Sequence, residues 1–217
     1  MDPFLPIECL GVVAFAVSGA MVAIRKGMDL FGVIVLGLFT AVGGGLFRDL
    51  VLGITPPQML RDPTFAIIAI TTSTLFFTLL YFVRREPSLR VKELSRLLLL
   101  YTDAVGLGVF TASGVDTAMR AYPSGTVFTT LFVALLTGTG GGILRDIMAG
   151  ETPSVLVRHI YAVAALVGAA VYLLLRNQLP TVWATICCTI VIVTIRGFAS
   201  HYRWNFPRIP SSGQPRL

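Results

Sequence analysis

The stretch Gly43–Pro56 reads GGGLFRDLVLGITP, and Gly140–Pro153 reads GGGILRDIMAGETP. Eight of the 14 aligned positions are identical, including the glycine triplet, the Arg-Asp pair and the final Thr-Pro. Upstream, Glu8–Arg25 aligns with Asp103–Arg120, and a shift of two residues separates this alignment from the first. The chain therefore contains an internal repeat, and the rest of the sequence is interpreted around it.

The composition around the repeat is typical of an integral membrane protein. Of the 217 residues, 55% are hydrophobic and 13% are charged, whereas a soluble domain is about 25% charged. A chain of this size cannot bury so much apolar surface in one soluble core, and its mean hydropathy of +0.81 agrees. This excludes a disordered protein, a disulfide-stapled secreted domain and most soluble enzymes.

Seven apolar segments are long enough to cross the hydrocarbon core of a bilayer, which needs roughly 20 residues. The runs are continuous and too long for barrel strands, so they predict helices and an all-α integral membrane protein. The predicted spans are Phe4–Ile24, Leu30–Leu52, Thr64–Val83, Leu97–Val115, Ser124–Ala149, Val155–Leu175 and Pro180–Ala199.

The repeat organises these spans into a single membrane domain, 1–217, with two halves. Residues 1–88 form the first three-helix repeat and residues 94–176 the second, while 180–199 is a seventh helix outside the repeat. Because three is odd, the second half enters the membrane from the opposite side. The sequence thus predicts an inverted 3+3 repeat plus one extra helix, an architecture that places binding sites near the midplane, where the halves meet.

The basic residues predict the orientation in a cell (inner) membrane. With the N-terminus outside, twelve Lys and Arg residues fall on the cytoplasmic side and three fall outside, as the positive-inside rule requires. The C-terminal segment 200–217, rich in Pro, Ser and Arg, is then predicted to be a flexible cytoplasmic tail. The twelve are Arg25, Lys26, Arg84, Arg85, Arg90, Lys92, Arg96, Arg158, Arg196, Arg203, Arg208 and Arg216.

Three consecutive glycines inside a helix are unfavourable, since each costs about 1 kcal/mol relative to alanine. The triplets should therefore kink or locally unwind the second and fifth helices, and carbonyls freed near Gly43 and Gly140 could hold a monovalent cation transiently. The alternative is close helix packing. Thr40 and Thr137 precede the triplets by three residues and either line an ion pathway or bond their own helix. The six glycines are Gly43, Gly44, Gly45, Gly140, Gly141 and Gly142.

Four charges follow the triplets by three or four residues: Arg48, Asp49, Arg145 and Asp146. They are still helical, since Gly53 and Gly150 are predicted to end their helices. Charges inside spans usually face a bundle interior or a cavity. The two-fold relation predicts cross-pairing of Arg48 with Asp146 and of Arg145 with Asp49. The four residues form either a structural ion-pair network or a charged pore neck that acts as a gate.

Other functional classes find no support in the sequence. There is no HExxH or GxSxG motif and no phosphate-binding loop, so no enzyme and no cofactor is expected. The formal net charge is +6, but the charges lie between apolar runs rather than in one patch, so no nucleic-acid partner is expected. The expected partners are monovalent cations, the lipid bilayer and further copies of the chain.

Two copies of GGG-x-x-RD-x-x-x-G-x-TP in a seven-helix chain resemble the prokaryotic trimeric intracellular cation (TRIC) channel family. The resemblance implies a homotrimer in which each subunit carries its own pore. That pore lies between the glycine-containing second and fifth helices and conducts potassium, with sodium also passing.

A second hypothesis stays open beside the cation channel. Bacterial proteins related to this family have been linked to glycine uptake, so the chain could be a carrier for a small zwitterion such as glycine. Paired Arg and Asp residues could hold a carboxylate and an ammonium group as readily as they could form a gate.

Overall fold

The computed structural model describes residues 5–83, 89–157, 160–202 and 204. Within these ranges the chain is helical and contains no strand, which confirms the predicted all-α class. The helices are α1 Leu5–Arg25, α2 Leu30–Val51, α3 Gln58–Arg61, α4 Thr64–Phe82, α5 Leu89–Ala121, α6 Val127–Met148, α7 Ser154–Val157, α8 Ile160–Leu175 and α9 Thr181–His201.

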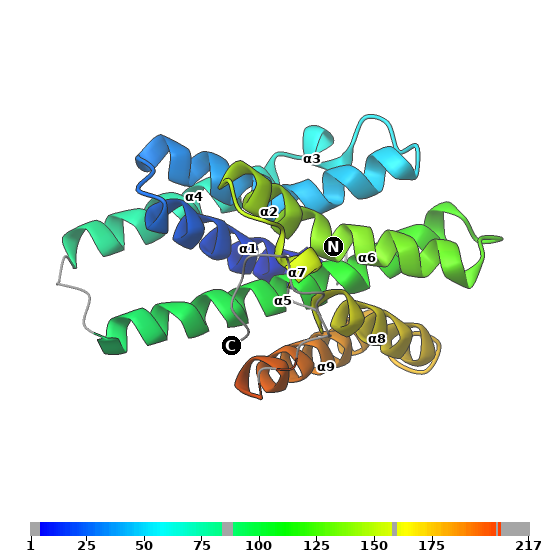
Figure 1. Cartoon of the computed structure of the whole chain (residues 1–217). Coiled ribbons are helices and arrows are strands. Elements are labelled where there is room, and N and C mark those ends of the chain that lie inside the picture. Colours follow the sequence, from blue (N-terminus) through cyan, green and yellow to red (C-terminus); the bar gives the residue numbers. More distant parts are fainter. Residues whose placement is uncertain (1–4, 84–88, 158–159, 203, 205–217) are drawn as a thin grey trace, which may run out of the picture.

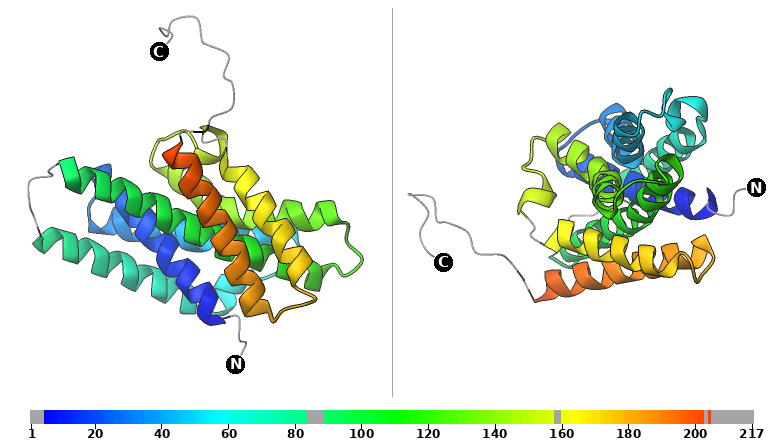
Figure 2. Two further views of the ribbon diagram at one scale, coloured as in Figure 1. Left: turned by 90° about the horizontal axis from the view of Figure 1, so that it is seen from below. Right: turned by 90° about the vertical axis from the view of Figure 1, so that its right-hand side faces the viewer.

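The long helices form one bundle (Figure 1). Helix α2 packs against α1, α4 and α6, and α5 packs against α1, α6, α8 and α9. Helices α8 and α9 lie side by side on one flank of the bundle, next to α5 (Figure 2). The two predicted halves therefore meet mainly through α1, α2, α5 and α6, while α9 is added against the second half.

Six helices in the described part of the chain are long and apolar enough to cross a membrane. Five of them, α1, α2, α4, α6 and α9, agree with predicted spans to within three residues at each end. Helix α8 has only 16 residues, about 24 Å at 1.5 Å per residue. The predicted count of seven spans is therefore not established by helix length alone.

Two predicted spans have different bounds in the structure. Helix α5 begins at Leu89, eight residues before the predicted start at Leu97, because Leu, Lys, Glu and Arg in this segment are good helix formers that can extend a helix into water. The span predicted at Val155–Leu175 corresponds to two helices, α7 and α8, and residues 158–159 between them lie outside the described residues.

The first residues of the predicted C-terminal tail are helical. Helix α9 continues to His201, so Ser200 is helical. Of the remaining tail, residues 203 and 205–217 lie outside the described residues.

Helices α2 and α6 end in the same way, as the repeat predicts. Gly53 and Gly150 adopt φ values of 69° and 68°, a left-handed conformation that glycine adopts without strain. The amide of Ile54 then donates to the carbonyl of Asp49, and that of Glu151 to Asp146, both at 2.8 Å. These are the hydrogen bonds of a glycine C-cap, so the predicted helix ends are confirmed.

The glycine triplets pack the halves together and do not unwind the helices. Both α2 and α6 are helical throughout the triplets. The prediction that the helices unwind locally and free carbonyls near Gly43 and Gly140 is therefore wrong. A Cβ on Gly44 would collide with the carbonyl oxygen of Thr137, and one on Gly141 with that of Thr40. This reciprocal contact is what a two-fold axis between α2 and α6 produces.

Thr40 and Thr137 take the second of their two predicted roles. Their hydroxyls donate to the carbonyls of Leu36 and Val133 in their own helices, each at 2.6 Å. Both side chains are fully buried, and in this structure neither is exposed to a water-filled pathway.

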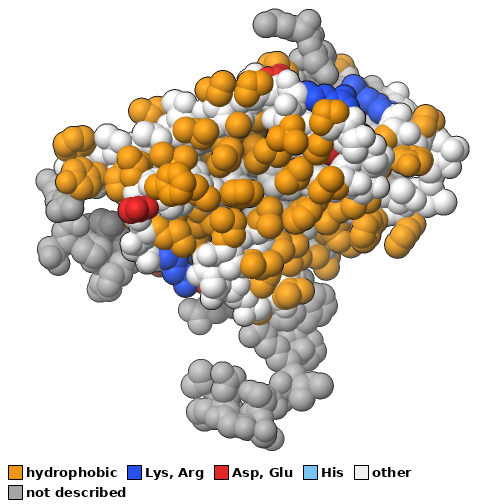
Figure 3. All heavy atoms as spheres, turned by 90° about the horizontal axis from the view of Figure 1, so that it is seen from above, with side chains coloured by type: hydrophobic (Ala, Val, Ile, Leu, Met, Phe, Trp, Pro, Cys, Tyr) orange, Lys and Arg blue, Asp and Glu red, His pale blue; other side chains and the backbone are white. Residues whose placement is uncertain are grey.

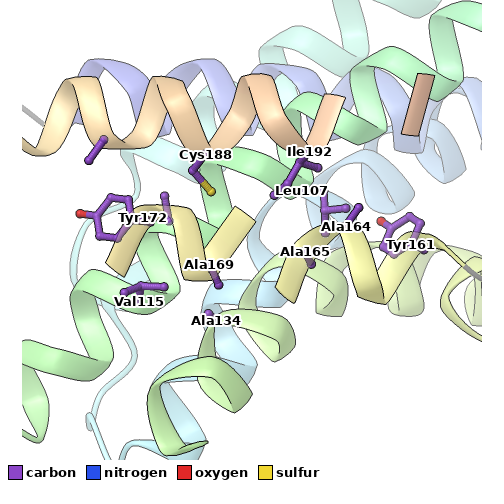
Figure 4. Close-up of a cluster of buried hydrophobic side chains, with 12 residues drawn as sticks. Leu107, Val115, Ala134, Tyr161, Ala164, Ala165, Ala169, Tyr172, Cys188 and Ile192 are labelled. Carbon is purple, nitrogen blue, oxygen red and sulfur yellow. The ribbon is translucent and has the colours of Figure 1, made fainter. Parts of the chain in front are cut away.

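Buried and exposed apolar residues separate as expected for a membrane protein. Tyr172, Leu107, Cys188 and Ile192 form a core where α8 and α9 pack on α5 (Figure 4). Outside, hydrophobic side chains dominate the face shown in Figure 3, and charged side chains are few there. Helix α4 is the most exposed of the long helices, with Phe82 at 80%, so it is suited to contact lipid or another subunit.

Replacing Gly44 with alanine should destabilise the protein, although alanine favours the helix by about 1 kcal/mol. The added methyl group forces α2 away from the Thr137 carbonyl, and overpacking of this kind typically costs about 1–3 kcal/mol. Gly45→Ala is the matched control, since its Cβ would meet nothing closer than Arg48 Nη2 at 3.9 Å. Thermal unfolding in detergent checks this: a Gly44→Ala protein as stable as Gly45→Ala would contradict the close contact.

Candidate functional site: two buried charge networks

The first network is centred on Arg48 near the end of α2. Its Nε donates to Asp49 Oδ1 at 2.8 Å, Nη1 donates to Ser113 Oγ at 3.0 Å, and Nη2 donates to Gln58 Oε1 at 3.3 Å. The Ser113 hydroxyl in turn donates to Glu8 Oε1 at 2.6 Å. Arg48 is 5% exposed and Asp49 is 1% exposed, so this chain of polar groups is largely removed from solvent.

The second network is centred on Arg145 near the end of α6. Its Nε donates to Asp146 Oδ1 at 2.8 Å, and Nη1 donates to Ser18 Oγ at 2.6 Å and to Asp103 Oδ1 at 2.5 Å. The other oxygen of Asp103 accepts from Arg196 Nη1 at 2.5 Å. All four charged groups of this network are at most 5% exposed.

The predicted cross-pairing of arginine with aspartate is wrong, because each arginine binds the aspartate next to it in its own helix. Each of the two arginines does contact the other half, but through a serine. Arg48 of the first half reaches Ser113 of the second, and Arg145 of the second half reaches Ser18 of the first.

The short helices α3 and α7 explain why the aspartates stay in their own halves. The second oxygen of Asp49 accepts from the backbone amide of Gln58 at 2.7 Å, and that of Asp146 accepts from Ser154 at 2.6 Å. Each carboxylate therefore ties the start of α3 or α7 to the preceding long helix. With one oxygen on the adjacent arginine and the other on this amide, both oxygens are already occupied within the same half.

Sequence reasoning identified the four central charges but only part of their surroundings. Glu8 and Asp103 were expected to correspond as acids, and both join the networks. Arg196 was expected to flank the membrane on the cytoplasmic side, whereas it is 5% exposed and bound to Asp103. Gln58 and Tyr161 were not predicted as site residues, and no motif marks either of them.

Tyr161 of α8 lies directly against the second network. The guanidinium carbon of Arg196 is 4.2 Å from the centre of the Tyr161 ring, a distance at which a cation is attracted to an aromatic face. The ring is 3% exposed. Arg196 thus contacts an acid on α5 and an aromatic ring on α8.

Two cavities adjoin the networks. One of about 20 Å³ is lined by Glu8, Gly45, Arg48, Asp49 and Gln58, which is room for about one water molecule. The other, of about 620 Å³, lies between α5, α8 and α9, and Arg196 and Tyr161 are part of its wall. No cluster of three or more metal-ligating side chains occurs among the described residues.

The paired charges suit a site within the membrane. An isolated charge at this depth is expensive, whereas a charge that is paired and hydrogen-bonded can be accommodated. The fold and these networks define a multi-pass membrane protein with two similarly built charge clusters.

Comparison with known proteins identifies the family. Residues 5–81 and 100–177 match the family described as "Glycine transporter". The chain is 42% identical to the UPF0126 membrane protein of Deinococcus radiodurans over 80% of this chain and 77% of that protein. It is 35% identical to the inner membrane protein YadS of Escherichia coli K12, covering 92% and 91%.

The structure resembles a solved TRIC cation channel with a TM-score of 0.79 and 37% sequence identity, covering 98% of this chain and all of that one. The chain therefore belongs to the glycine-transporter family, and the predicted resemblance to the TRIC channels is confirmed.

A double-mutant cycle should separate the observed pairing from cross-pairing. Asp49→Asn removes the carboxylate from a buried arginine, which typically costs about 3–5 kcal/mol, and in an Arg48→Leu background the same change should cost much less. Arg48 and Asp146 belong to different networks and have no common partner among the contacts described above, so the destabilisations by Arg48→Leu and Asp146→Asn should add within about 0.5 kcal/mol. Unfolding of the purified variants in detergent measures both couplings. A larger coupling for Arg48 with Asp146 than with Asp49 would refute the observed arrangement.

Proposed function

We propose that this protein is a channel for monovalent cations, with potassium as its main ion. The observation that carries the proposal is the similarity of nearly the whole chain to a TRIC cation channel at 37% identity. The pathway runs within each subunit, between α2 and α6, and the working unit is a homotrimer in the bilayer.

The charge networks fit the chemistry of such a pathway. Arginines alone would repel cations, but Arg48 and Arg145 each have an adjacent aspartate that cancels the charge. Both networks contain a serine from the opposite half, so a movement of one half against the other changes them. We infer that they form the neck of the pore, and that the glycine contact between α2 and α6 holds this neck closed.

The positions of the basic residues in the sequence support the proposed orientation. We place the N-terminus outside and the C-terminus in the cytoplasm, because most basic residues between the spans then lie on the cytoplasmic side. The similarity to the inner membrane protein YadS supports a cell-membrane location.

The family description favours one second candidate, a carrier for glycine. Arg48 could bind its carboxylate, and Glu8 or Asp49 its ammonium group. The cavity beside these residues has room for about one water molecule, so glycine would have to separate α1 and α2 from their neighbours before it could enter. A partly dehydrated cation needs a smaller change, and this supports the channel.

The purified protein in a planar bilayer should show discrete currents that reverse near the equilibrium potential of potassium in a potassium chloride gradient. Glu8→Gln removes an acid that lines the cavity at Arg48, so the reversal potential should move toward that of chloride. Ser154→Ala keeps the backbone amide that Asp146 binds and serves as the control.

Radiolabelled glycine uptake into liposomes holding the same protein provides the second measurement. Currents without uptake support the channel. Saturable uptake without discrete currents would refute the channel and support the glycine carrier.

A further inference from the structure

Asp103 is bound by two arginines that come from different helices. Arg145 on α6 contacts one carboxylate oxygen and Arg196 on α9 contacts the other, each at 2.5 Å. The four charged groups of this second network, Asp103, Asp146, Arg145 and Arg196, therefore balance as two acids and two bases. Without Arg196 they would carry one excess negative charge.

Arg196 comes from outside the inverted repeat. Helix α9 has no equivalent among the two sets of three predicted spans, and it packs on α5 and α8 of the second half. In the first half the acid that corresponds to Asp103 is Glu8, which accepts a hydrogen bond from Ser113. An added helix thus supplies a positive charge to one of the two networks.

Arg196 connects the second network with a cavity on the flank of the bundle. The residue forms part of the wall of the cavity of about 620 Å³ between α5, α8 and α9, and on its other side it binds Asp103. Tyr161 lies at one end of α8 next to α9 (Figure 4) and holds the guanidinium at 4.2 Å from its ring. Arg196 therefore stands between a large cavity and the buried acid.

We propose that Arg196 is a selectivity-determining residue: it cancels the charge of Asp103 in the second network, which belongs to the proposed pore neck, and so limits the preference of the protein for cations over anions. The inference rests on the proposed cation conduction. It assigns to α9 a function that the inverted repeat alone does not supply, which is to make the two charge networks electrostatically unequal.

The test is the ratio of potassium to chloride permeability, obtained from reversal potentials in planar bilayers. Arg196→Gln leaves Asp103 with one arginine, and the ratio should rise by roughly threefold to tenfold, as expected for one unit charge at partly screened distance. Asp103→Asn has the opposite effect, because both arginines stay. The double variant restores the balance of one acid and one base and should return toward the wild-type ratio, since coupled sites are not additive.

Two further variants separate selectivity from structure. Arg196→Lys keeps the charge and should keep the ratio close to that of the wild type. Arg120→Gln is the matched control, because Arg120 also pairs with an acid on α5, Asp116 at 2.7 Å, but its side chain is 61% exposed. A ratio does not depend on how many channels insert, so reduced expression cannot imitate the expected shifts.

The outcomes distinguish this inference from the proposed function. A wild-type protein that carries no cation current overturns the proposed function. A wild-type protein that conducts while Arg196→Gln and Asp103→Asn leave the ratio unchanged overturns the inference alone. If Arg196→Gln does not assemble, the comparison of Asp103→Asn with the double variant decides: a lower ratio that the second substitution restores supports the inference, and equal ratios overturn it.

Discussion

The two halves of the molecule touch backbone to backbone, where Gly44 lies against the carbonyl of Thr137 and Gly141 against that of Thr40. Only glycine allows two helices to approach this closely, since any Cβ would occupy the space of the facing carbonyl. In a bilayer such contacts are a main source of helix association, because lipid tails are as apolar as the side chains they would replace.

This contact fixes the position of the charges. The arginines follow the triplets in the same helices, so the approach of α2 and α6 brings each arginine within reach of a serine from the opposite half. The serines lie on α1 and α5, which also pack against each other. One backbone contact therefore determines the geometry of two polar networks that share no residue.

The two networks also show that the halves of an inverted repeat can differ in their charged groups. Equivalent arginines, aspartates and serines appear in both halves with the same pattern of hydrogen bonds. The networks differ in the third acid: Arg145 binds Asp103 directly and Arg196 of α9 binds its other oxygen, whereas Glu8 accepts from Ser113. Two related halves supply two similar charge networks. A helix added to one half makes the charges of the two networks unequal.

The sequence by itself determined the membrane class, the repeat, most helix bounds and the residues at the centre of the site. These follow from local properties: apolar run length, the glycine cap after α2 and α6, and the expense of charges inside a span. The sequence did not determine which residues these charges bind. Asp49 binds Arg48 and the amide of Gln58, and sequence symmetry alone favoured a partner in the other half.

Only the tertiary structure decided which way the glycines act and what Arg196 does. A glycine triplet lowers helix propensity in isolation, yet packing against a neighbouring backbone holds α2 and α6 helical throughout. Arg196 resembles a membrane-flanking charge by position, and it becomes part of the site because α9 packs along α5 and brings it to Asp103. Contacts between distant helices depend on how the helices pack, and no local pattern in the chain records that.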